Sequence, residues 1–96
     1  MAAKQNHAEA QHSLGDLYSR GLGVIQNDTE AANWYRRAAA QNIAGAQRKL
    51  GDLYRQGLGI PKDLAMAVKL YREAAKQGDR VGQYNLGYSY KLVVRI

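Results

Sequence analysis

The sequence predicts an all-α protein built as a stacked array of two-helix units, about two and a half units with five helices. First, the chain matches itself when shifted by 36 residues, and half of positions 6–41 are identical to positions 42–77. Second, apolar residues within each unit recur at helical spacing, and glycine or asparagine separates the helical segments. A fixed period in this range is the signature of a repeat array.

The first unit predicts helices over about residues 7–20 and 28–41. Gly21-Leu22-Gly23 ends the first helix, because glycine enters the left-handed conformation without a Cβ penalty. Asn27 is a favourable N-cap for the second helix, and Glu30 completes a capping box three residues later. Asn42 follows the second helix and Asn6 stands one period earlier, so we expect a left-handed cap at both.

The second unit predicts helices over about residues 44–56 and 64–77. Ala46, Leu50 and Leu53 share one face of the first helix, Asp63 caps the second, and Gly78 ends it. The third unit begins on the same register but lacks a second helix. We therefore expect one domain over residues 1–96, with repeat one at about 6–41, repeat two at about 42–77 and a partial repeat at about 78–96.

Small and aromatic residues recur on the same period. Glycine inside a helix costs about 1 kcal/mol relative to alanine. Its recurrence at Gly15, Gly51 and Gly87 predicts that a neighbouring backbone comes too close for a side chain. The recurring tyrosines are predicted to fill the core between units, and they are Tyr18, Tyr54, Tyr90, Tyr35 and Tyr71.

The composition excludes several classes of protein. The chain has no cysteine, which rules out disulfides and thiolate metal sites. No apolar run approaches the roughly 20 residues of a membrane span. The N-terminus lacks the apolar core of a secretory signal, so a cytoplasmic location is the default expectation. The net charge of +6 is compatible with acidic proteins, nucleic acid or anionic lipid.

The repeated positions form a pattern that resembles the Sel1-like repeat family. In repeat two its residues are Ala44, Ala46, Gln47, Leu50, Gly51, Leu53, Tyr54, Gly57, Gly59, Ile60, Asp63, Ala67, Tyr71, Arg72, Ala74, Ala75, Gln77 and Gly78. The resemblance implies an α/α superhelical solenoid related to tetratricopeptide arrays. It further implies a non-enzymatic scaffold or adaptor that binds other proteins.

In the related tetratricopeptide geometry, the first helix of each repeat lines a concave face. The register then selects variable rows of residues on that face, for which we predict partner binding: Glu9, His12, Asp16, Arg48, Asp52, Arg55, Tyr84 and Tyr88. The arginines would bind carboxylates and the tyrosines would serve as flat anchors. The alternative is a solvated helix face on which Asp52 pairs with Arg48 and Arg55.

Other chemistries have less support in the sequence. His12 and Asp16 are spaced i, i+4 but lack the further ligands that a structural zinc site needs, so we expect no metal and no cofactor. The serines lie on helices without a glycine-rich elbow, which argues against an enzyme. RNA binding is the alternative to protein binding, but Asp16 and Asp52 would repel phosphate, and several basic residues fall on second helices, namely Arg36, Arg37, Lys69, Arg72 and Lys76.

The third unit predicts exposed apolar residues, because no second helix follows to cover Leu92, Val93, Val94 and Ile96. We therefore expect either a segment of a longer array or self-association into a homo-oligomer through this incomplete repeat.

Overall fold

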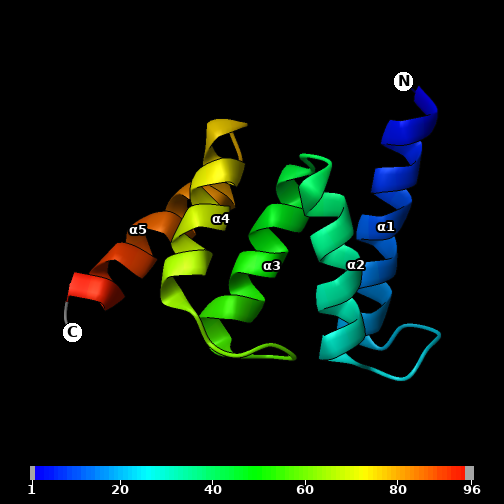
Figure 1. The fold of residues 1–96 in the computed structure, drawn as a ribbon, viewed down its shortest axis with the longest axis horizontal. Helices are drawn as coiled ribbons and strands as arrows, with labels where there is room; N and C mark the ends of the chain where they lie inside the picture. Colours follow the sequence, from blue (N-terminus) through cyan, green and yellow to red (C-terminus); the bar gives the residue numbers. More distant parts are fainter. Residues whose placement is uncertain (1, 95–96) are drawn as a thin grey trace.

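The computed structural model describes residues 2–94 as a row of α-helices, with no strand among them (Figure 1). The five helices are α1 (Ala2–Arg20), α2 (Asp28–Ala40), α3 (Ala44–Gln56), α4 (Leu64–Lys76) and α5 (Arg80–Val94). This arrangement confirms the all-α solenoid and its five helices.

The helices stack in chain order, so that α1 and α5 lie at opposite ends of a slab measuring 41 × 31 × 17 Å (Figure 1). Each helix packs mainly on its neighbours in sequence, whereas α3 and α5 barely touch. Every main interface therefore joins a first helix to a second helix. The largest core cluster lies where α2 meets α3 and consists of Ala31, Ala32, Tyr35, Ala38, Ala46, Leu50 and Leu53.

The second helices begin at the predicted caps. The side chains of Asn27 and Asp63 accept hydrogen bonds at 3.0 Å from the backbone N–H groups of Glu30 and Met66. The second hydrogen bond of the predicted capping box, from the backbone N–H of Asn27 to the side chain of Glu30, does not form. The backbone N–H of Asn27 instead donates to the carbonyl of Tyr18 at 2.9 Å, so that it needs no bond from Glu30.

The left-handed turns after the second helices are confirmed at Asn42, with φ 68°, and at Gly78, with φ 84°. The same prediction is wrong for Asn6, which lies inside α1. Residues 2–5 already belong to α1, which runs without a break through Asn6, so no turn is needed at this position.

The recurring glycines have a different cause from the one predicted. A Cβ at Gly15 or Gly51 would meet the ring of Tyr35 at 2.5 Å or that of Tyr71 at 2.8 Å, so a side chain and not a backbone occupies the space. The same Cβ at Gly87 would meet nothing within 4 Å.

The five recurring tyrosines differ in how deeply they are buried. Tyr35 and Tyr71 are fully buried as predicted, and Tyr18 and Tyr54 are partly buried. The core prediction is wrong for Tyr90, which is 43% exposed, since the described residues include no second helix of its own repeat to cover it.

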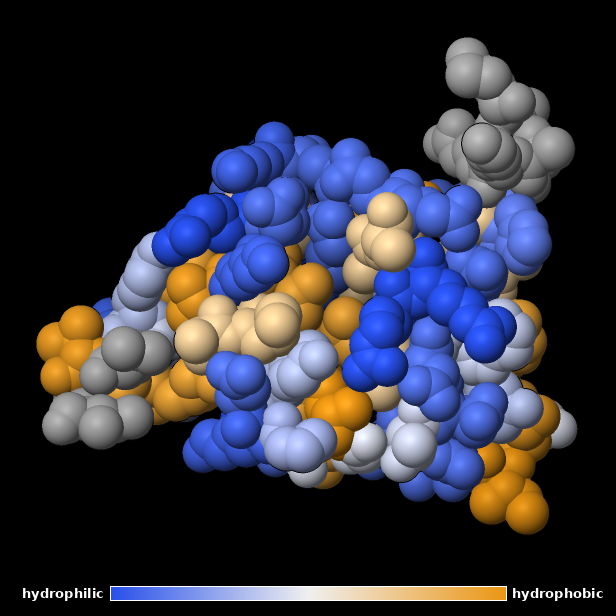
Figure 2. Space-filling view, in the orientation of Figure 1, coloured by the Kyte–Doolittle hydropathy of each residue, from blue (hydrophilic) through white to orange (hydrophobic). Residues whose placement is uncertain are grey.

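Hydrophobic side chains reach the surface at both ends of the array. Figure 2 shows them near the C-terminal end of α5 and at the loop that follows α1. Val94 is 83% exposed and Ile25 is 90% exposed, whereas Leu92 is partly buried. The side chain of Val93 and all of Ile96 lie outside the described residues, so self-association through this end stays a prediction.

Candidate binding surface

The same partly buried pair of side chains, an aspartate and a tyrosine, holds each complete repeat together. Tyr35 donates its hydroxyl to Asp16 at 2.6 Å, and Tyr71 donates its hydroxyl to Asp52 at 2.5 Å. In each pair the carboxylate comes from the first helix and the phenol from the second. Two residues predicted to contact a partner, Asp16 and Asp52, therefore orient the hairpin itself.

Each carboxylate also reaches into the next repeat. Asp16 accepts a bond from Lys49 Nζ at 3.3 Å, and Asp52 accepts one from Asn85 Nδ2 at 3.2 Å. Lys49 and Asn85 stand one period apart, on α3 and α5. A single carboxylate thus connects three helices, and it remains about one-third exposed at the seam between repeats.

These contacts shift the ionisation of the groups involved. Burial and the neighbouring carboxylate raise the pKa of Tyr35 and of Tyr71 well above 10. Partial burial acts to raise the pKa of Asp16, but the hydrogen bond from Tyr35 and the charge of Lys49 outweigh it, so that the pKa is lowered. Asp16 is therefore a carboxylate at neutral pH and keeps its bond to Lys49.

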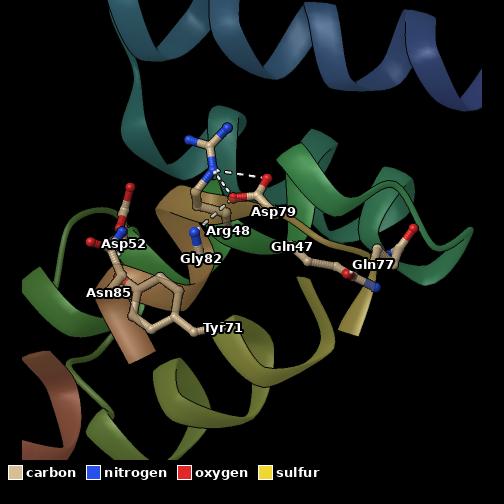
Figure 3. Close-up of polar contacts among 8 residues, drawn as sticks. All are labelled: Gln47, Arg48, Asp52, Tyr71, Gln77, Asp79, Gly82 and Asn85. Carbon is tan, nitrogen blue, oxygen red and sulfur yellow. Dashed lines mark hydrogen bonds and ion pairs between the residues drawn. The ribbon is translucent and has the colours of Figure 1, made fainter. Parts of the chain in front are cut away.

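Arg48 pairs across the repeats with a residue that the sequence reasoning did not select. Its Nε lies 3.1 and 3.3 Å from the two carboxylate oxygens of Asp79, which also accepts the backbone N–H of Gly82 at 2.7 Å (Figure 3). The expected pairing of Arg48 with Asp52 is replaced by this contact. Asp79 stands just before α5, where a carboxylate caps the helix and is close enough to bind Arg48.

Arg55 does pair with Asp52, as the alternative interpretation predicted, with 3.6 Å between Nη2 and Oδ1. Its Nε also donates to the Tyr71 hydroxyl at 3.1 Å. Its guanidinium lies 5.6 Å from the centre of the Tyr88 ring, within range of a cation–π interaction. Arg55 therefore links the core of repeat two to the exposed surface of α5.

The remaining predicted residues differ in exposure. His12 is partly buried, lies 3.7 Å from Asp16 and covers Gly45 of the next repeat. Glu9 is exposed, and Tyr84 and Tyr88 are 74% and 45% exposed. Among the described residues, no group of three or more side chains could hold a metal ion. Within the same part of the chain, no helix has the length and hydrophobicity that crossing a bilayer requires.

Two hollows accompany these residues. One of about 430 Å³ opens between repeats one and two and is lined by Ser19, Gln26, Asp28, Tyr35, Lys49, Asp52, Leu53, Gln56 and Leu58. One of about 320 Å³ lies on α5 and is lined by Gln83, Tyr84, Gly87, Tyr88 and Lys91. Sequence reasoning missed Lys49 and Gln56 because the rows followed only the positions assigned to the concave face.

A solenoid of 36-residue helical hairpins, with hollows between and beside its first helices, defines a helical-repeat scaffold. The family model of the Sel1 repeat matches residues 8–43, 44–79 and 81–91, and the chain belongs to this family. Sel1 repeat proteins generally mediate protein–protein interactions.

Solved structures show the same fold. A Sel1 repeat protein from Oxalobacter formigenes is 44% identical, with a TM-score of 0.84, over 91% of this chain and 35% of its own. A protective antigen with an SLR fold, present in uropathogenic Escherichia coli strains, is 40% identical, with a TM-score of 0.86, over 93% of this chain and 19% of its own. The chain thus spans about a third and a fifth of their lengths. No curated protein sequence is significantly similar to it.

Proposed function

We propose that the chain is a non-enzymatic interaction module that binds a partner protein or peptide on the face lined by α1, α3 and α5. The observation that carries the proposal is the 430 Å³ hollow between repeats one and two. It is bordered by two first helices and is rich in polar side chains, among them Lys49, Gln56 and Ser19. Such a hollow offers hydrogen-bond donors and acceptors to an extended peptide.

The predicted binding residues divide into two roles under this proposal. Asp16, Asp52, Arg48 and Arg55 already bond within the chain, so they shape the surface and set its charge. Exposed groups beside them make the contacts. On α1 the exposed group is Glu9, whereas Tyr84 and Tyr88 supply aromatic surface on α5, the kind of residue that dominates binding energy at interfaces.

We favour a protein partner over RNA because of where the charges lie. The exposed cations of the second helices are Arg36, Arg37, Lys69, Arg72 and Lys76, which lie on α2 and α4 and not on the proposed face. On the proposed face the cations of α3 are already paired, Lys49 with Asp16, Arg55 with Asp52 and Arg48 with Asp79, so that they are less available to phosphate. Binding to single-stranded RNA should therefore be weak at physiological salt, and tight binding that falls steeply with salt would favour the RNA alternative.

A display library of random peptides, screened against the immobilised chain, tests the proposed surface. Gln56, the last residue of α3, is exposed at the hollow, and Gln56→Trp would fill the space without breaking a described contact. Ala40→Trp is the matched control, since Ala40 is the exposed last residue of α2. Peptides that bind the unaltered chain should be lost with Gln56→Trp and kept with Ala40→Trp. An unchanged set of peptides with Gln56→Trp would contradict the proposal, as would a library that yields none.

A further inference from the structure

In each complete repeat, the second helix packs on the first through a tyrosine ring that lies directly over a glycine. In repeat one the Tyr35 ring occupies the space over Gly15, and in repeat two the Tyr71 ring occupies the space over Gly51. The interface is tight, because a Cβ on either glycine would come within 2.8 Å of a ring carbon. The chain thus contains two examples of the same ring-on-glycine contact.

A pair of glutamines marks the other end of each interface. Gln41 donates its amide to the side chain of Gln11 at 2.7 Å, and Gln77 donates in the same way to Gln47 at 3.0 Å. In both repeats the donor lies on or directly after the second helix, six residues beyond the buried tyrosine. Ring and amide therefore align the second helix on the first.

On α5 the receiving half of this interface is present and uncovered. Gln83 and Gly87 stand one period after Gln47 and Gly51, and both are exposed. A Cβ on Gly87 would meet nothing, and the 320 Å³ hollow lies over it. The α5 surface thus continues an interface that the chain has already formed twice.

Two substitutions change what α5 can receive. Tyr88 stands where Asp16 and Asp52 stand in the complete repeats, so no carboxylate is present to accept a tyrosine hydroxyl. Burying a hydroxyl without an acceptor is costly, so an apolar ring fits this site better. Lys91 stands where Arg55 does, and α5 contains no acidic residue.

We propose that α5 docks an acidic amphipathic helix of another protein, which seats an apolar aromatic side chain over Gly87 and sets a carboxylate against Lys91. This inference rests on the proposed function and specifies the partner of its α5 portion. The ring would lie between Tyr84 and Tyr88, where aromatic contacts add to burial. Small residues on the docking helix would permit the close approach seen at α2 and α4.

A second copy of the chain fits this surface poorly. The extensive interfaces within the chain all join a first helix to a second helix, and the first helices α3 and α5 barely touch. The first helices α1 and α5 lie at the two ends of the described array, so end-to-end stacking would place two first helices together. The α5 surface thus receives a kind of helix that neither end of the described array offers.

Fluorescence anisotropy with a labelled, capped peptide of about 16 residues tests the proposal, since shorter helices are marginal in water. The peptide carries phenylalanine with alanines four residues before and three after it, the spacing of Ala67, Tyr71 and Ala74. It carries glutamine six residues after the phenylalanine and glutamates on the flanks. Gly87→Leu fills the hollow on an exposed helix position and should keep the fold. Ala65→Leu, at an exposed position on α4, is the matched control.

We expect saturable binding to the unaltered chain, at least about ten-fold weaker when the peptide phenylalanine becomes alanine or the protein carries Gly87→Leu. Lys91→Glu should weaken binding, while Ala65→Leu should leave it unchanged. If the peptide binds Gly87→Leu and the unaltered chain with equal affinity, or does not bind the unaltered chain, the inference is overturned. The display-library test of the hollow between repeats one and two is independent of this result. Self-association that Gly87→Leu abolishes, in the absence of peptide binding, would also overturn it by making a second copy the occupant.

Discussion

Replacing Gly51 with alanine should destabilise the protein, although alanine is the better helix former. The new Cβ would lie 2.8 Å from Tyr71 Cε1 and 3.0 Å from Cδ1. The ring cannot move aside easily, because it is fully buried and its hydroxyl is bonded to Asp52 and Arg55. Overpacking of this kind costs about 1–3 kcal/mol, and the gain in helix propensity returns about 0.5–1 kcal/mol. The net loss should lie within about 0–2.5 kcal/mol.

Gly87→Ala is the matched control, because Gly87 occupies the same register one repeat later. Its Cβ meets nothing within 4 Å, so only helix propensity changes. This variant should therefore gain about 0.5–1 kcal/mol. The same substitution at equivalent positions of one chain is thus expected to have opposite signs.

Urea denaturation followed by far-ultraviolet circular dichroism measures both variants against the unaltered chain. For a domain of this size, 1 kcal/mol corresponds to a shift of about 4–8 °C in Tm, so thermal scans provide an independent check. The m-values should agree, which shows that the midpoints report stability and not a change in the unfolded state. If Gly51→Ala stabilises the protein, the close contact between the Tyr71 ring and Gly51 is refuted. If Gly87→Ala destabilises it, the absence of neighbouring atoms around Gly87 is refuted.

Three further results are expected from the same measurements. Tyr71→Phe removes the hydrogen bonds of the hydroxyl with Asp52 and Arg55 and should cost about 1–2 kcal/mol of stability. As a control, Tyr54→Phe should change stability by less than about 0.5 kcal/mol. Equal losses in the two variants would contradict a stabilising role of the Tyr71 hydrogen bonds. Asp79→Asn keeps a cap for Gly82 but loses the charge facing Arg48, so it should cost less than Asp79→Ala, which loses both and about 1–2 kcal/mol; an unchanged stability in Asp79→Asn would argue against the ion pair, and equal losses in the two variants would argue against the cap. The folded pKa of Tyr35 and Tyr71 exceeds the unfolded value of about 10, so their stability is fully present below pH 10 and is lost as the pH rises through the folded pKa. Tyrosinate absorbance for these two should therefore rise together with unfolding, and ionisation before any loss of helix would contradict their burial.

Much of the fold follows from the sequence because period and spacing act locally. The helix limits, the caps at Asn27 and Asp63 and the left-handed turns at Asn42 and Gly78 each depend on a few adjacent residues. The cause of the recurring glycines could not be read in the same way. That a tyrosine ring, and not a backbone, fills the space over Gly51 depends on how two helices cross. Sequence spacing leaves that crossing undetermined.

The candidate site shows a second reason why sequence reasoning stops short. Variation between repeats at equivalent positions predicts residues that are free to bind a partner. In the structure Arg48 bonds to Asp79 while His12, one period earlier, covers Gly45, so part of the variation reflects what stands opposite in the next repeat. The position shared by His12 and Arg48 therefore contacts the next repeat in both complete repeats. It follows that the aromatic surface at Tyr84 and Tyr88 is the part of these rows most open to a partner.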